Sequence, residues 1–417
     1  MRNSAQFGAV ILRRLLRYRY NPIIEGTQRD PSTPWKDPTS GEWRLRTFDS
    51  IVYGSASDAD LLAGKWYTIG TQPDFRQCEC PSVYPLPAAT PGTEDAYAAA
   101  ARAGALPTTV HKTSCGGDWW QLGTYSPAPP KTLGAFYATP GCAAQTSARN
   151  SARPANSGRN YFRQRNSSDA HTKSPSALSR WDDLFAQRKI DQGKFYASKD
   201  NLYPTAAGGT RRINWGWATV PPASTQTLPR EITFNAAARA LQQYPIEEIK
   251  ALRGPAAVSR KGVAVAGTTD LGLKAGVAKQ SEVVVTFTLP ATAATLGVSI
   301  NGSEALACTI EFTPPADASK AYDVPVACGG YKDTLTLVPG EVSVELRLFL
   351  DWTMVEVYFQ QGRVAMTAAL AMDDSTAVAL TSADPPAALA TADVEVYPMK
   401  SIWTTADAVR KQKRVFG

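Results

Sequence analysis

The chain has 417 residues and a formal net charge of +7, with 43% hydrophobic and 19% charged residues. Those proportions are typical of a folded globular protein of two or three domains, and they exclude a disordered chain. No helix-turn-helix, zinc-finger or aromatic RNA-binding motif accompanies the basic charge, so we predict no nucleic-acid partner. GxSxG, Walker and GxGxxG motifs are missing from the sequence, which argues against serine hydrolases, P-loop enzymes and dinucleotide enzymes.

Neither a metal nor an organic cofactor is predicted. The chain has only two histidines, His111 and His171, which excludes a histidine-rich metal site. Its six cysteines form no CxxC pair and show no metal-ligand spacing.

Residues 1–20 are predicted to be a leader that is amphipathic or unstructured. The apolar run at residues 10–12 is broken by Arg13 and Arg14 and is far too short to span a membrane. No signal peptide is visible, because neither a convincing charged segment before the apolar run nor a convincing small-residue cleavage site after it is present.

Residues 21–245 contain many short strand-like runs separated by turns rich in Gly, Pro, Ser and Asp. Such spacing predicts an all-β sandwich, barrel or propeller, and periodicity alone does not choose between them. The clearest runs are residues 43–52, 65–70, 119–125, 193–198 and 212–218.

Two insertions interrupt this part of the chain. Residues 93–105 are rich in alanine and fit a short helix or, as we favour, a surface excursion. Residues 144–188 are rich in Ser, Asn, Arg and Ala and are predicted to be a mobile loop. Glycosylation sequons at Asn166 and Asn301 point only weakly to a secretory route, because such tripeptides are common by chance.

The C-terminal part is predicted to be a β-sandwich that spans residues 255–400, with residues 245–254 as the connector. Apolar residues alternate with polar ones around positions 283–289 and 344–350, as expected for half-buried antiparallel strands. Cys308 and Cys328 either pair, if the protein is exported, or remain two free thiols. Residues 401–417 form a basic tail.

Glu79 is the residue that most suggests chemistry. It lies between Cys78 and Cys80 and is followed by Pro81, and strand-like runs flank the group. A carboxyl in a partly apolar pocket has a raised pKa, which suits a general acid near neutral pH. Taken alone, the stretch also fits an ordinary surface glutamate in a loop.

Several short motifs occur together with Glu79 in a fixed order. In that order and spacing they resemble the invertase family of glycoside hydrolases, the β-fructofuranosidases, and especially the plant-type acid invertases. Each motif is weakly specific, but the ordered set is strongly specific and covers about residues 21–400. The motifs lie at residues 28–31, 77–81, 194–199, 211–218, 228–231, 245–253, 346–351 and 355–363.

The resemblance implies a five-bladed β-propeller, incomplete here, followed by a β-sandwich, with the active site at the mouth of the propeller channel. By motif, Glu79 resembles the acid/base that protonates the leaving oxygen, and Asp30 resembles the carboxylate that stabilises the transition state. Arg29 and Cys80 are their companions in these motifs. A nearby cation such as Arg29 lowers an aspartate pKa. Taken alone, residues 29–31 also fit a β-turn capped by an aspartate.

Two further substrate-binding residues are predicted. Asp191 resembles a family aspartate that helps to bind sugar hydroxyls, although an ordinary turn carboxylate is an equal alternative. Trp217 and Trp215 alternate with Gly216, so both indoles point to one face of a strand, where rings can stack on a sugar. Two tryptophans on one strand face are more often core, so we expect at least one of them there.

The family nucleophile is absent from this sequence. That residue is the Asp of an Asn-Asp-Pro motif in the first blade, and no such stretch precedes Arg29. We therefore predict a retaining β-fructofuranosidase that cleaves sucrose or small fructans, impaired or inactive as written. A non-catalytic fructoside-binding propeller protein is the alternative, and a fructosyltransferase is the third reading. Family resemblance implies an extracellular or vacuolar location, and we predict no oligomeric state.

Overall fold

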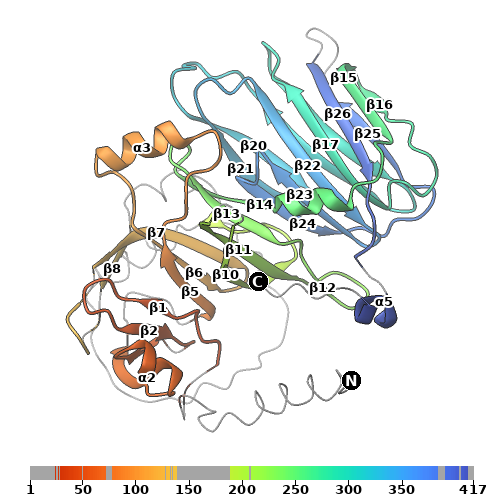
Figure 1. The fold of residues 1–417 in the computed structure, drawn as a ribbon. Coiled ribbons are helices and arrows are strands. Elements are labelled where there is room, and N and C mark those ends of the chain that lie inside the picture. The colour runs from red at the N-terminus through yellow and green to blue at the C-terminus, as the bar shows by residue number, and fades with distance from the viewer. Residues whose placement is uncertain are drawn as a thin grey trace, which may run out of the picture. The chain divides into compact units, whose positions relative to one another are not determined.

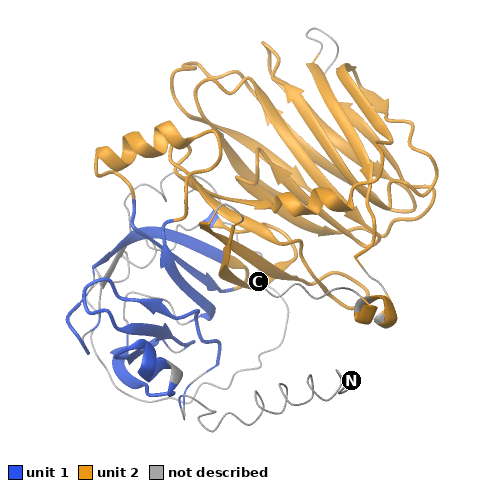
Figure 2. Ribbon diagram, viewed as in Figure 1, with its two compact units in different colours: residues 1–86, 107–115, 119–188 blue, residues 87–106, 116–118, 189–417 orange. Residues whose placement is uncertain are grey.

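The computed structural model describes residues 24, 27, 29–48, 50–71, 78–126, 128–131, 133, 135–138, 188–205, 208–383, 390–402 and 405–411. The predicted leader, nearly all of the insertion at 144–188, the sequon at Asn166 and the end of the basic tail lie outside these residues. The chain divides into two compact units (Figure 2). Unit 1 comprises residues 1–86, 107–115 and 119–188, and unit 2 comprises residues 87–106, 116–118 and 189–417.

Unit 1 is built on two sheets. The first is a four-stranded antiparallel meander of β1 (Trp35–Lys36), β2 (Trp43–Arg46), β3 (Ile51–Ser55) and β4 (Tyr67–Thr71), with helix α2 (Asp58–Leu62) between its last two strands. The second has the order β5 (Glu79–Pro85), β6 (Thr109–Ser114), β7 (Asp118–Ser126) and β8 (Ala135–Ala138). The predicted single run at 43–52 is therefore wrong, because a turn in which Ser50 has φ 66° separates β2 from β3.

The long C-terminal segment of unit 2 begins with a third antiparallel sheet, which is similar to the two sheets of unit 1. Its strands are β10 (Phe195–Pro204), β11 (Thr210–Ala218), β13 (Arg230–Asn235) and β14 (Ala240–Pro245), and β12 (Thr225–Gln226) pairs with β11. The short strand β9 (Arg188–Lys189) falls at the boundary between the units. Three blade-type sheets are therefore present in the described residues (Figure 1).

The alanine-rich insertion forms helix α3 (Glu94–Arg102), the alternative that we ranked second. Alanine is the best helix former, and Glu94 and Asp95 in the first turn with Arg102 in the last complement the helix dipole. The helix buries none of its residues.

A β-sandwich follows the 3-10 helix η1 (Glu247–Leu252). One six-stranded sheet has the order β15 (Val258–Val265), β26 (Ala390–Pro398), β17 (Gln280–Thr288), β22 (Ser343–Asp351), β23 (Met354–Phe359) and β24 (Val364–Ala369). The other has the order β16 (Thr268–Asp270), β25 (Ala377–Ser382), β18 (Ala294–Asn301), β19 (Ala305–Phe312), β20 (Tyr322–Cys328) and β21 (Tyr331–Leu337). Helix α5 (Ala406–Lys411) lies in the predicted tail.

The alternation read from the sequence builds the sandwich core. Val283, Val285 and Phe287 on β17 are fully buried, and the antiparallel register places each opposite a buried residue of β22. The sandwich strands run from 258 to 398, close to the predicted 255–400. The predicted domain boundary at the connector stays a prediction, because the compact units divide the chain at other residues.

Candidate active site

Glu79 is the first residue of β5, at a break in the sheet ladder. Glu79 lies opposite Ser114 and Ser82 lies opposite Lys112, so two residues of β5 face only one residue of β6. This is a β-bulge, a feature that often occurs beside active sites because it turns a side chain away from the strand direction. Cys80, inside the bulge, has φ 47°, which is the left-handed region that residues other than glycine rarely adopt.

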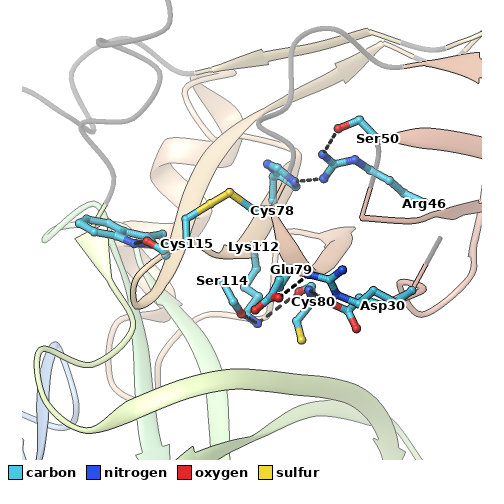
Figure 3. The surroundings of a disulfide bond; sticks show 12 residues. Asp30, Arg46, Ser50, Cys78, Glu79, Cys80, Lys112, Ser114 and Cys115 are labelled. Atoms are coloured by element: carbon cyan, nitrogen blue, oxygen red, sulfur yellow. Dashed lines mark hydrogen bonds and ion pairs between the residues drawn. A yellow bond between two sulfur atoms is a disulfide. The ribbon is translucent and has the colours of Figure 1, made fainter. Parts of the chain in front are cut away.

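Asp30 lies against this bulge (Figure 3). Arg29 pairs with Glu79 at the same place. Arg29 Nη2 donates to Glu79 Oε1 at 2.7 Å, and its Nε is 3.7 Å from Asp30 Oδ2. The same Asp30 oxygen accepts the Cys80 N–H at 3.3 Å. Four of the six predicted site residues are therefore together, although they come from segments about fifty residues apart.

The carboxylates of this group are accessible to a ligand. Glu79 and Asp30 have side-chain exposures of 33% and 25%, and Arg29 is 52% exposed. The guanidinium of Arg29 lies 4.3 Å from the centre of the Phe48 ring, which fixes its position. Such screened ion pairs contribute little to stability, so this arrangement suits recognition and proton transfer better than folding.

A disulfide that the sequence did not reveal flanks Glu79. Cys78 bonds to Cys115, with a Cα–Cα distance of 5.6 Å that is normal for a disulfide. Because Glu79 pairs with Ser114, the bond joins the residues directly adjacent to that pair. The pairing of Cys78 with Cys115 can be recognised only when the register of β5 against β6 is known. Among the cysteines of the described residues, Cys80 forms no disulfide, and it is buried.

Basic side chains are buried behind the bulge. Lys112 is 1% exposed, and its Nζ donates to the Cys80 carbonyl at 3.3 Å and to Ser114 Oγ at 2.9 Å. Arg46 Nη1 donates to His111 Nε2 at 2.7 Å, so that ring nitrogen is an acceptor and the proton of the neutral ring is on Nδ1. Burial, followed by the charges of Arg46 and Lys112, holds the pKa of His111 well below 6.5.

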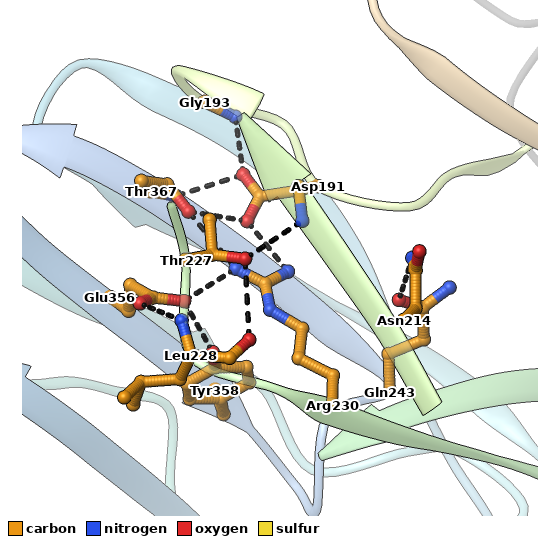
Figure 4. Close-up of polar contacts among 11 residues, drawn as sticks. Asp191, Gly193, Asn214, Thr227, Leu228, Arg230, Gln243, Glu356, Tyr358 and Thr367 are labelled. Atoms are coloured by element: carbon orange, nitrogen blue, oxygen red, sulfur yellow. Dashed lines mark hydrogen bonds and ion pairs between the residues drawn. The ribbon is translucent and has the colours of Figure 1, made fainter. Parts of the chain in front are cut away.

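Asp191, predicted to bind sugar hydroxyls, occupies a different environment in unit 2. Its side chain is fully buried and forms a 3.0 Å ion pair with Arg230. It also accepts the N–H groups of Gly193 and Thr367, each at 2.8 Å, and the Thr367 hydroxyl at 2.7 Å (Figure 4). A carboxylate that is buried and saturated in this way fits a structural role, and we leave it out of the substrate site.

Arg230 is the centre of that buried cluster, and the sequence did not single it out. Its guanidinium donates to Glu356 at 2.7 Å and to Thr367 at 3.1 Å. It also lies 4.6 Å and 4.9 Å from the ring centres of Phe195 and Tyr358. The residues of the cluster come from the third blade and from the sandwich, so it ties these two parts of unit 2 together.

Trp217 and Trp215 line a shallow pocket of about 490 Å³ in unit 2, with Lys199, Ser224 and Gln226. Trp217 is 49% exposed and Trp215 is half-buried, so the prediction that at least one belongs to the core is wrong. The physical reason is Gly216, which presses against the ring of Phe195 on the opposite face of the strand. That opposite face is the one that packs inward, which leaves both indoles outside.

No group of three or more metal-binding side chains occurs in the described residues. Among these residues, no helix is long and apolar enough to cross a membrane.

Comparison with known proteins identifies the class of the second half of the chain. Residues 248–398 match the family described as the C-terminal part of glycosyl hydrolases family 32. The chain is also 27% identical over 309 residues to "Beta-fructofuranosidase, insoluble isoenzyme 6" of rice, a match that covers 66% of this chain and 44% of that protein. "Fructan 6-exohydrolase" of wheat is 24% identical over 319 residues, covering 67% of this chain and 44% of that protein.

A solved structure extends the likeness to most of the fold. Fructan 1-exohydrolase IIa from Cichorium intybus superposes with a TM-score of 0.62 at 18% identity, over 91% of this chain and 74% of that one. The predicted fold class, an incomplete five-bladed propeller followed by a β-sandwich, is thereby confirmed. Residues 248–398 thus match the C-terminal part of this glycoside hydrolase family, and a larger part of the chain is similar to β-fructofuranosidases and fructan exohydrolases. Its matches span less than half of the length of these curated relatives.

Proposed function

We propose that this chain carries the acid/base and the transition-state stabiliser of a retaining β-fructofuranosidase acting on sucrose or small fructans. The observation that carries the proposal is the joined group of Glu79 and Asp30. Two partly exposed carboxylates from distant segments meet through Arg29 and the Cys80 N–H, at a bulge that aims Glu79.

Each residue has a distinct task in this proposal. Glu79 gives a proton to the glycosidic oxygen as the bond to the fructosyl carbon breaks. Asp30 binds sugar hydroxyls and stabilises the positive charge that develops on the ring. Arg29 holds the two carboxylates in a fixed position relative to each other, and such chemistry depends on this positioning.

A location outside the cytosol, extracellular or vacuolar, fits the thiol chemistry of the chain. Cys308 and Cys328, for which the sequence left two readings open, are bonded across neighbouring strands. With Cys78–Cys115 this makes two disulfides in the described residues, and such bonds form and persist in oxidising compartments.

Glucose release from sucrose, with and without azide, tests the proposal. Azide can attack the anomeric carbon in place of a protein carboxylate. The bond to the glucose oxygen then breaks, Glu79 protonates that oxygen, and the products are fructosyl azide and glucose. We expect azide to raise glucose release from the wild-type chain, and we expect Glu79→Gln to abolish this release.

The remaining outcomes separate the other candidate functions. Release without azide that Glu79→Gln abolishes means that this chain supplies its own nucleophile, and new oligosaccharide among the products indicates a transferase. Heat of binding to a kestose without any turnover favours the fructoside-binding protein. Turnover that survives Glu79→Gln contradicts the role of Glu79.

A further inference from the structure

The backbone at Cys80 is held in a conformation that its sequence disfavours. Its φ of 47° places it in the left-handed region, where a side chain is crowded. The next residue is Pro81, and a residue before proline is normally extended. Residues in sparsely populated regions persist only when their surroundings hold them, and they concentrate at functional sites. Something in unit 1 must therefore stabilise this peptide.

Lys112 supplies one of the contacts that hold Cys80. The Lys112 ammonium donates to the Cys80 carbonyl at 3.3 Å, while Asp30 accepts the Cys80 N–H at 3.3 Å. The backbone of Cys80 is thus held from both sides. Another hydrogen bond of Lys112, at 2.9 Å, goes to Ser114, which is the partner of Glu79 across the ladder.

Burial makes this lysine an unusual choice for a merely structural contact. Lysine is almost never fully buried, because removing an ammonium from water is costly. Lys112 is nevertheless 1% exposed, and it donates to the Cys80 carbonyl and to Ser114 at the bulge that carries Glu79 (Figure 3). A neutral side chain would fill the same space without that penalty, but it would leave the Cys80 carbonyl without this donor.

We propose that Lys112 is a positioning residue for the acid/base: it holds the left-handed Cys80 conformation and so aims Glu79 at the glycosidic oxygen. This inference rests on the proposed function, and it adds a residue that the motifs did not indicate. Lys112 need not touch the substrate. Its effect reaches the reaction through the backbone of one bulge, so its loss should change turnover much more than substrate binding.

The test combines a labelling rate with turnover in Lys112→Met, which keeps a side chain of similar length. Cys80 is buried, so in the folded wild type we expect slow alkylation by iodoacetamide, measured by peptide mapping. In K112M the bulge relaxes, and we expect Cys80 to react at least about tenfold faster. Glucose release should fall about 100-fold in kcat with KM nearly unchanged, since small displacements of a catalytic group have effects of that size.

Two further variants isolate the mechanism. Cys80→Gly adopts the left-handed conformation without crowding, so in this background K112M should lose less than tenfold in turnover. Lys332→Met removes an exposed lysine on β21 and should change neither readout. Lys112→Gln retains an N–H donor, and it replaces K112M in both assays if K112M does not fold by circular dichroism. Its expected changes are in the same direction but smaller.

The two readouts separate failure of this inference from failure of the proposed function. Unchanged Cys80 labelling in the Lys112 variants overturns the inference, whether or not the wild type turns over. Faster labelling with unchanged turnover in an active wild type also overturns it. If the wild type releases no glucose even with azide, the proposed hydrolysis fails, while the labelling rate still decides whether Lys112 holds Cys80.

Discussion

Two arginine–carboxylate clusters in this molecule contain the same chemical groups but have different roles. In unit 1, Arg29 joins Glu79 and Asp30, and the three side chains are 25–52% exposed. In unit 2, Arg230 joins Asp191 and Glu356, and all three are buried. Exposed carboxylates are accessible to a substrate. Buried carboxylates whose hydrogen bonds are made within the protein hold strands together. Burial therefore separates a candidate catalytic carboxylate from a structural one where the motif alone does not.

The strongest way to break the comparison is to remove the buried cation. Arg230→Met leaves Asp191 and Glu356 buried without their partner, so we expect a loss of about 3–5 kcal/mol in the free energy of unfolding. Urea unfolding monitored by circular dichroism measures it. The matched variant Arg29→Met should lose less than about 1 kcal/mol, because its ion pairs are screened by solvent. Equal losses in the two variants would remove the distinction.

A change that leaves every charge in place tests the packing of the same cluster. In Gly193→Ala the new Cβ would lie 1.9 Å from the backbone oxygen of Thr367, which also donates its N–H to Asp191. The backbone at Gly193 must move away from that of Thr367, so we expect destabilisation of about 1–3 kcal/mol. Gly208→Ala is a suitable control, since nothing lies within 4 Å of its added Cβ, although its own φ of 85° carries some strain. Denaturant midpoints of the two variants should differ clearly.

His111 extends the comparison to a buried titratable group within unit 1. Its pKa is lowered well below 6.5, first by burial and then by Arg46 and Lys112. Below pH 6.5 His111 binds a proton in the unfolded chain but stays neutral in the folded chain. The free energy of unfolding therefore falls as the pH falls, with a slope of up to about 1.4 kcal/mol per pH unit. Above pH 6.5 this contribution is fully present. His111→Gln should flatten the slope in unfolding curves recorded between pH 7 and pH 5, and an unchanged slope would assign it to other groups.

The smallest expected effect concerns the aromatic contact of Arg29. Phe48→Leu removes the ring that lies 4.3 Å from the guanidinium while retaining apolar bulk. Exposed contacts of this type contribute about 0.5–1 kcal/mol, so binding of a fructoside should weaken by less than about tenfold. Calorimetric titration with 1-kestose measures the change. A loss as large as the one measured for Arg29→Met in the same titration would mean that the ring itself contacts the sugar.

The sequence predicted the parts of the molecule that depend on local pattern or on ordered motifs. The alternation of apolar and polar residues at 283–289 indicated the sandwich. The motifs indicated that Arg29, Asp30, Glu79 and Cys80 share one site, and these residues lie together in the structure. Features that depend on long-range pairing were missed. Cys115 becomes a partner of Cys78 only through the register of β5 and β6, and Arg230 acquires its role only through strands more than a hundred residues away.

Asp191 and Trp215 show the complementary limit. Both were read from motifs, but a motif does not tell how deeply a side chain is buried. Asp191 is buried and accepts hydrogen bonds from Thr367. Trp215 lies outside the core because Gly216, on the opposite face of the strand, packs against Phe195. Burial is a tertiary property, set here by which face of a strand meets its neighbour.

The most direct test of the account replaces one glutamate of each cluster by its amide and measures two quantities in both variants. We predict that Glu79→Gln abolishes glucose release, measured with azide present, and leaves the free energy of unfolding within about 0.5 kcal/mol of the wild type. Glu356→Gln should instead lower the unfolding free energy by about 1–3 kcal/mol, because Arg230 and Tyr358 lose a charged acceptor. If Glu79→Gln destabilises the fold as much as Glu356→Gln and leaves glucose release intact, Glu79 is structural and the central claim is wrong.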